Sequence, residues 1–150
     1  MKWGNSTWKL FHTLAEKIKD NYFMEEKNNL IHFITLICNN LPCSMCKNHA
    51  VLYLKKNPMK KIKTKDDLKN YIFNFHNEVN KRKRIKIYNY KILNEYKKIN
   101  FTNTINEWLN NFKLPNYLIA RDFLIKHKNH KIRTELVNYL KKNYHKFLIN

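Results

Sequence analysis

Cys43 and Cys46 have the spacing of a redox-active or metal-binding pair, and both lie just after Pro42. Residues three apart share a face of a helix, so the two sulfurs can form a disulfide with little backbone adjustment. The helix N-terminus stabilises a thiolate, and we expect Cys43 to be the better nucleophile and leaving group. A loop this short constrains the unfolded chain little, so a purely structural disulfide is not expected.

The same region of the sequence also allows a zinc site. Cys38, Cys43, Cys46 and His49 offer three thiolates and one imidazole, a common ligand set for zinc. Cys38, however, falls in the apolar stripe of a predicted helix, which favours a small buried core residue. A thioredoxin-like site is not expected, because its motif follows a strand and no strand is visible.

Composition limits the other functions that the chain can have. The 150 residues include 30 Lys or Arg and 11 Asp or Glu, for a net charge of +19. Lys and Asn together make up a third of the chain, so compositional bias and selection for an anionic partner both explain the charge. The single glycine excludes glycine-rich phosphate loops and dinucleotide fingerprints.

Neither a membrane span nor an export signal is expected from the sequence. No stretch approaches 18 uninterrupted apolar residues. The first twenty residues contain Trp3, Glu16 and Asp20 among other polar and bulky side chains, and lack an apolar signal core. We therefore expect an intracellular protein without a signal peptide.

The residues around the cysteines show helical periodicity, which predicts an all-α fold. Apolar residues recur at three-and-four spacing, and no run alternates as a strand would. Asn5 or Ser6 is the predicted cap of the first helix, and Pro42 is predicted to begin the third. Thr64 followed by acidic residues is typical of the start of a fourth helix. The predicted helices cover about residues 6–22, 24–39, 42–57 and 65–79.

The chain changes character after residue 80. Residues 81–98 hold eight basic residues and one acidic residue, and weaker helical stretches follow at 104–112, 116–127 and 130–148. We divide the chain into a bundle domain over 1–100 and a helical C-terminal extension over 101–150 that packs on it. The extension is a candidate docking site for an anionic or scaffold partner. The basic run with its aromatic neighbours also allows an alternative function, a zinc-stabilised basic helical module that binds nucleic acid.

Three segments together resemble the Erv/ALR family of FAD-linked sulfhydryl oxidases. The first is WGxxxWxxxHxxA, from Trp3 to Ala15; the second is LPCSMC at 41–46, and the third is HNxVN at 76–80. Their order and their spacing of about 30 residues match the family. The run from 41 to 58 is similar to the small versions encoded by large cytoplasmic DNA viruses of the African swine fever virus type. The resemblance covers residues 2–98.

The resemblance implies a fold and an activity. The fold is a four-helix bundle with a short fifth helix, usually dimeric, that holds FAD. The activity is FAD-dependent thiol oxidation, in which electrons pass from protein thiols through a CxxC pair and FAD to O2, giving H2O2 and disulfide bonds. Cys46 is then the sulfur beside the flavin, and Cys43 exchanges with substrate thiols. No second cysteine pair exists here, so substrates meet Cys43 directly.

The resemblance also implies a set of cofactor contacts. These are Gly4, Trp8, His12, Cys46, Tyr71, His76, Asn77, Asn80, Lys83 and Tyr96. Tyr71 stands where the family commonly has Trp, and Lys83 and Ile85 stand where it has Leu and Lys. We expect Lys83, Arg84 or Lys86 to supply the charge near the pyrophosphate. A viral setting implies host cytoplasm, its virus factories and the virion as locations.

Overall fold

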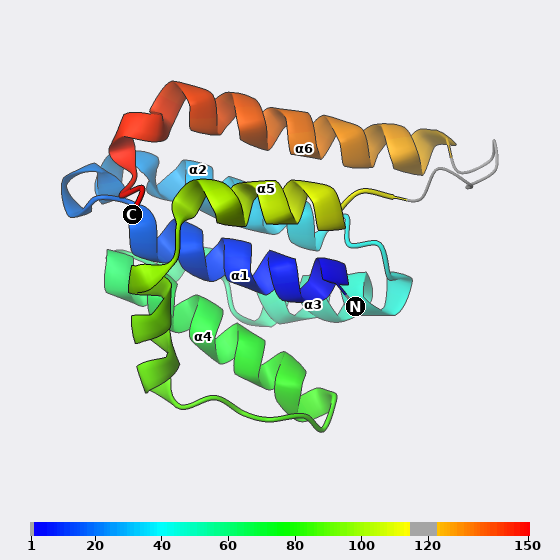
Figure 1. Cartoon of the computed structure of the whole chain (residues 1–150). Helices are drawn as coiled ribbons and strands as arrows, with labels where there is room; N and C mark the ends of the chain where they lie inside the picture. The colour runs from blue at the N-terminus through cyan, green and yellow to red at the C-terminus, as the bar shows by residue number, and fades with distance from the viewer. Residues whose placement is uncertain (1, 115–122) are drawn as a thin grey trace.

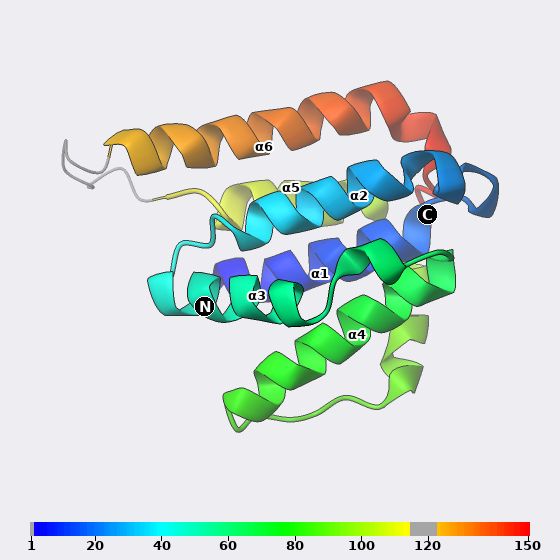
Figure 2. The same cartoon turned by 180° about the vertical axis from the view of Figure 1, so that it is seen from behind.

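The chain forms a stack of helices, which Figure 1 and Figure 2 show from opposite sides. This computed structural model describes residues 2–114 and 123–150. Within those ranges there is no β-strand, only an isolated antiparallel bridge between Ile18 and Phe147, so the all-α prediction is confirmed. The α-helices are α1 (Lys2–Lys17), α2 (Phe23–Cys38), α3 (Ser44–Lys56), α4 (Lys65–Arg82), α5 (Phe101–Asn111) and α6 (Phe123–Asn143). The 3-10 helices are η1 (Asp20–Tyr22), η2 (Met59–Lys61), η3 (Tyr90–Lys98) and η5 (Tyr144–Lys146).

The layers of the stack are the same in both views. α6 lies at one edge, α2 and α5 come next, α1 and α3 follow, and α4 lies at the opposite edge. α1 packs against α4 and η3 on one side and against α5 on the other. Helices α1 to α4 form the expected bundle, and η3 is the short fifth helical segment. α1 therefore lies between the α4–η3 side of the bundle and α5.

The ends of two helices follow from local side-chain chemistry. Thr64 caps α4: its hydroxyl accepts from the Asp67 backbone N–H, and the Asp67 carboxylate accepts from the Thr64 N–H. This reciprocal pair confirms the predicted start of the fourth helix. α3 begins at Ser44, two residues later than predicted, because Cys43 takes the N-cap position in extended backbone. The dithiol thus lies at the boundary between a loop and a helix.

The predicted start of the first helix was wrong. α1 begins at Lys2, so neither Asn5 nor Ser6 is its cap. The Ser6 hydroxyl donates to the Lys2 carbonyl at 3.0 Å, and the Thr7 hydroxyl donates to the Trp3 carbonyl at 2.6 Å. Hydroxyls that bond one turn back are used inside a helix rather than at its end. The longer helix places Trp3 and Gly4 on the same rigid element as Trp8.

The C-terminal extension shares the core of the bundle. Trp108 is fully buried, and its indole N–H donates to the Thr7 hydroxyl at 3.1 Å. Phe101, Phe112 and Leu136 belong to the same hydrophobic cluster as the residues of α1 and α2. The expected packing of the extension on the bundle is confirmed, whereas the boundary near residue 100 stays a prediction. Within residues 2–114 and 123–150, no helix is long and apolar enough to cross a membrane.

The last helices differ from those predicted. Residues 116–122 of the stretch predicted at 116–127 lie outside the described residues, and from Phe123 a single helix continues to Asn143. The predicted break near residue 130 was wrong, because neither glycine nor proline lies there to end the helix. The chain leaves α6 at Asn143 instead of continuing to 148. Its end then pairs with the end of α1, since the Leu148 N–H donates to the Lys17 carbonyl at 2.6 Å.

Candidate active site

Cys43 and Cys46 are adjacent, partly exposed thiols at the start of α3. The backbone N–H of Cys46 donates to the Cys43 sulfur at 3.2 Å. Hydrogen bonds from the Cys46 thiol and backbone lower the pKa of Cys43, whereas burial raises the pKa of Cys46. Lys83 favours the thiolate at both sulfurs by its charge. In the reduced pair, Cys43 is therefore the more easily ionised sulfur, as its N-terminal position predicts.

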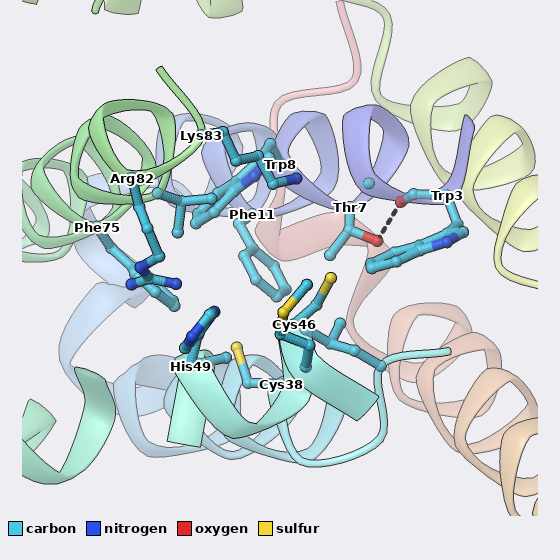
Figure 3. A pocket seen from close by; sticks show the side chains of 15 residues that line it. Trp3, Thr7, Trp8, Phe11, Cys38, Cys46, His49, Phe75, Arg82 and Lys83 are labelled. Carbon is cyan, nitrogen blue, oxygen red and sulfur yellow. Dashed lines mark hydrogen bonds between the residues drawn. The ribbon is translucent and has the colours of Figure 1, made fainter. Parts of the chain in front are cut away.

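A cavity of about 290 Å³ lies on one side of the dithiol and is called the thiol-side cavity below. Figure 3 shows side chains from α1, α3 and α4 pointing into it. Its walls are mainly aromatic and aliphatic, with Cys46 among them, and Lys83 is one of its few charged residues. Four of the predicted cofactor contacts line this cavity: Gly4, Trp8, Cys46 and Lys83. A flat apolar group fits beside the Cys46 sulfur here.

A second cavity of about 440 Å³, the histidine-side cavity, lies between α1, α4 and η3. The predicted residues that line it are Trp8, His12, His76, Asn77, Asn80 and Tyr96. The resemblance implies that these residues and those of the thiol-side cavity form one set of contacts around a single cofactor. The structure instead has two cavities, and Trp8 lines both of them.

Four aromatic rings connect the elements around the histidine-side cavity. Trp8 and His76 stack with centroids 4.4 Å apart, and His12 and Tyr96 stack at 4.5 Å. His12 Nε2 and His76 Nδ1 are 3.1 Å apart. Burial lowers the pKa of His12 to about 3 and that of His76 to about 4, so both rings are neutral near pH 7. Neutral rings suit this contact, because one nitrogen can donate while the other accepts.

The two asparagines of the HNxVN segment have different roles. Asn77 is fully engaged, since its amide donates to the Tyr88 carbonyl and accepts from the Tyr88 N–H, each at 2.9 Å. It therefore fastens the segment after α4 to the helix. Asn80 is buried, and its side-chain nitrogen has no hydrogen-bond partner. An unpaired buried donor costs about 1–3 kcal/mol, which points to a ligand acceptor in the histidine-side cavity.

The basic run turns sharply at the end of α4. Arg84 has φ of 56°, and the Ile85 N–H donates to the Asn80 carbonyl at 3.0 Å. This is a Schellman-type end, in which glycine is the usual left-handed residue. The turn places Lys83 at the thiol-side cavity and Lys86 at the histidine-side cavity.

Tyr71 lies away from both cavities, and Arg84, one of the three residues expected near the pyrophosphate, lines neither of them. The Tyr71 hydroxyl donates to the Asn57 carbonyl at 2.7 Å, and its ring packs near Tyr53 and Phe75. Five residues along an α-helix rotate a side chain by about 140°, so Tyr71 and His76 point to different sides of α4. The structure does not bring Tyr71 together with the other site residues.

Other residues of the cavities did not emerge from the motifs. His49, Phe75 and Arg82 line the thiol-side cavity. His49 follows Cys46 by three residues on α3, and the sequence indicated it as a candidate zinc ligand but not as a cofactor contact. Among residues 2–114 and 123–150, no group of three or more His, Cys, Asp or Glu side chains is placed to hold a metal ion. The zinc alternative therefore lacks its ligand set, although Cys38, Cys46 and His49 line the same cavity.

Comparison with known proteins agrees with this geometry. Residues 5–102 match the Erv1 / Alr family. The chain belongs to this family. It is 37% identical over 99 residues to the FAD-linked sulfhydryl oxidase of African swine fever virus, covering 66% of this chain and 80% of that protein. It is also 32% identical over 81 residues to a putative FAD-linked sulfhydryl oxidase of Invertebrate iridescent virus 3, covering 53% and 55%.

The similarity extends to a protein of a cellular organism. Identity to the FAD-linked sulfhydryl oxidase ERV2 of Saccharomyces cerevisiae is 38% over 56 residues, which cover 37% of this chain and 29% of that protein. The family match ends at residue 102, near the predicted end of the bundle domain. α6 lies beyond that match.

Proposed function

We propose that this Erv1 / Alr chain is a FAD-dependent thiol oxidase that forms disulfide bonds in protein substrates and passes the electrons to dioxygen, which leaves as hydrogen peroxide. One observation carries the proposal: Cys46 of an asymmetric dithiol lines an aromatic cavity between α1, α3 and α4. The names of the viral relatives, FAD-linked sulfhydryl oxidases, support the same activity.

The residues present fit FAD. The aromatic walls of the thiol-side cavity suit a flat ring system, and Gly4, the only glycine of the chain, has no Cβ to obstruct it. The unpaired amide nitrogen of buried Asn80 supplies a donor on the histidine side. Lys83 and Lys86 place positive charge at one cavity each, which suits a dinucleotide with two phosphates.

We assign the two cavities to the two ends of the cofactor. Gly4, Trp8, Cys46 and Lys83 would hold the flavin end, and His12, His76, Asn80 and Tyr96 would hold the adenosine end. Asn77 acts indirectly, by fixing the backbone of Tyr88. Tyr71 is left out of this assignment because it lies outside both cavities.

The cysteines perform two exchange steps. A substrate thiolate attacks Cys43 Sγ of the oxidised pair, the Cys43–Cys46 bond breaks, and Cys46 leaves as a thiolate. A second substrate thiolate attacks the mixed disulfide, which releases oxidised substrate and leaves both cysteines reduced. When bound, FAD would accept the two electrons from the cysteine pair and would pass them on to dioxygen. Lys83 favours the thiolate forms that these steps require.

The visible absorption spectrum of the purified protein tests this proposal. A flavin band with about one FAD per chain, bleached by a dithiol under anaerobic conditions and restored by air, is the expected result. Colourless protein that does not take up added FAD would overturn it.

The assembly and location also belong to the proposal. We expect a homodimer, and its interface must avoid the faces of α1 and α2 that α5 and α6 cover. Light scattering during size-exclusion chromatography distinguishes a dimer from a monomer. We also expect a place inside infected cells, in the cytoplasmic virus factory and the virion; the viral origin of two relatives supports a viral setting. Fractionation of infected cells and virions with a specific antibody tests that location.

A further inference from the structure

A groove of about 710 Å³ opens beside the loop that carries the dithiol. One wall is that loop, with Leu41, Pro42 and Ser44. The opposite wall comes from the extension, with Leu114 after α5 and Ile125 in the first turn of α6. Figure 1 and Figure 2 both show the α2–α3 loop and the beginning of α6 at the same end of the molecule.

The groove passes next to the sulfur that substrates must reach. Pro42 and Ser44, the two neighbours of Cys43, both line it. Cys43 is partly exposed, and hydrogen bonds from Cys46 lower its pKa, so it is the more easily ionised sulfur of the pair. A polypeptide lying in the groove therefore brings its own cysteine close to Cys43. Trp3 and Leu41 line both this groove and the thiol-side cavity, so the two are neighbours.

The charged side chains among the described lining residues of the groove are all basic. Lys47 of α3, Lys113 after α5 and Lys128 of α6 line it, and no Asp or Glu is among its described lining residues. The other described lining residues are apolar or carry amides, apart from the hydroxyl of Ser44. A substrate segment with acidic side chains complements the three lysines. Apolar side chains next to the substrate cysteine complement the apolar lining residues of the groove.

The wall that the extension supplies is held in place by specific bonds. Asn129 of α6 is buried; its amide donates to the Phe112 carbonyl at 2.8 Å and accepts from Arg133 Nε at 3.1 Å. Further along α6, the Tyr139 hydroxyl donates to the Glu26 carboxylate of α2 at 2.7 Å. These bonds fix α6 to both α5 and α2. The groove therefore exists before a substrate arrives, which lowers the entropic cost of binding.

We propose that this groove docks the substrate polypeptide, and that the preferred substrate presents its cysteine within an extended, acidic segment. The inference rests on the proposed function, because the occupant is the thiol substrate of Cys43. It gives the extension a role in choosing substrates. The exchange at Cys43 is unchanged: the substrate thiolate forms a bond to Cys43 Sγ while Cys46 leaves.

The test compares two dithiol peptides that differ only in flanking charge, one with Asp residues and one with Lys residues. The oxidase is the full-length FAD-loaded protein, as wild type and as the double variant Lys113→Glu with Lys128→Glu. A matched control is Lys141→Glu with Lys142→Glu, which makes the same charge change at exposed positions at the far end of α6. Rates are normalised to dithiothreitol oxidation by the same protein.

Wild type is expected to favour the Asp peptide through a lower KM, and added salt should reduce the preference. The groove variant should lower the ratio of kcat/KM values, Asp peptide over Lys peptide, by roughly tenfold or more, while the control retains it. Equal use of both peptides by wild type, or an equal change in the control, would overturn docking in the groove. Absence of dithiothreitol oxidation by wild type would instead overturn the proposed function.

Discussion

Trp8 of α1 stacks on His76 of α4, with ring centroids 4.4 Å apart and planes 9° from parallel. Both cavities of the proposed cofactor site include Trp8 in their walls, whereas His76 lines only the histidine-side cavity. The stack thus joins a residue of the first motif to a residue of the third. It makes the shape of the site depend on how α1 and α4 pack together.

Replacing either cysteine of the pair should abolish turnover. Cys43→Ser removes the sulfur that meets substrate, and Cys46→Ser removes the sulfur in the wall of the thiol-side cavity. Neither change removes an aromatic wall of a cavity, so FAD should stay bound in both variants. Oxygen consumption with a dithiol substrate and the flavin spectrum are the two measurements. Normal oxygen uptake by either variant would rule out the two-step exchange.

Cys38→Ala should leave turnover nearly intact. Burial raises the pKa of the Cys38 thiol to about 12, so it stays protonated at physiological pH. Its side chain is buried at the end of α2, and alanine avoids placing an unpaired hydroxyl there. A small loss of stability, about 1 kcal/mol, is expected from the lost packing. Steady-state rates and urea unfolding separate the two effects, and a large fall in kcat with the fold intact would show that Cys38 takes part.

Asn80→Ala should weaken FAD retention by roughly two- to tenfold, because one hydrogen bond contributes about 0.5–1.5 kcal/mol. In the cofactor-free protein the same change should cost little stability, since the Asn80 side-chain nitrogen has no partner to lose. Asn74→Ala, at an exposed position on the same helix, is the control. FAD release in equilibrium dialysis and unfolding of the apoprotein give the two readouts. Equal FAD retention by both variants would remove Asn80 from the site.

Acidification should destabilise the fold through His12 and His76. In the folded protein their pKa values are about 3 and about 4, below the ordinary value of 6.5. At a pH between the folded value and 6.5, the unfolded chain therefore binds more protons than the folded protein. Their contribution to stability is therefore complete above about pH 6.5 and is lost as the pH falls toward 4. Each histidine contributes at most about 1.4 kcal/mol per pH unit to that slope.

Urea unfolding of wild type and His12→Gln at pH 5 and pH 7 measures this dependence. The variant is less stable at pH 7, but its stability should change less between the two pH values because one buried imidazole is gone. Identical pH dependence in both proteins would mean that His12 does not titrate differently in the folded and unfolded states.

Local rules predicted the parts of the fold that depend on neighbouring residues. The Thr64 capping box and the dithiol at the start of α3 follow from contacts within four residues of each other. Those rules do not predict contacts between segments that are distant in the sequence. The pairing of Ile18 with Phe147 joins segments that are far apart in the sequence, and the orientation of Tyr71 depends on how α4 is turned in the packed bundle. The spacing in the resemblance predicted that Tyr71 lies on the same helix as His76. It did not predict that the two side chains point to different sides of that helix.

Arg84→Gly should stabilise the protein without changing FAD retention. Arg84 holds φ of 56° at the left-handed end of α4, a conformation that costs a residue with a Cβ roughly 1 kcal/mol and costs glycine little. The hydrogen bond from Ile85 N–H to the Asn80 carbonyl remains, so the turn that positions Lys83 is kept.

Part of that gain is offset by the larger entropy of glycine in the unfolded chain, and a net increase of about 0.5 kcal/mol in the free energy of unfolding is expected. Glu78→Gly is the matched control, because this exposed residue lies inside α4 and glycine there should cost about 1 kcal/mol. Urea unfolding of the two variants should therefore give changes of opposite sign. A loss of stability in both would show that the left-handed turn carries no strain, and that the Arg84 side chain itself stabilises the end of the helix.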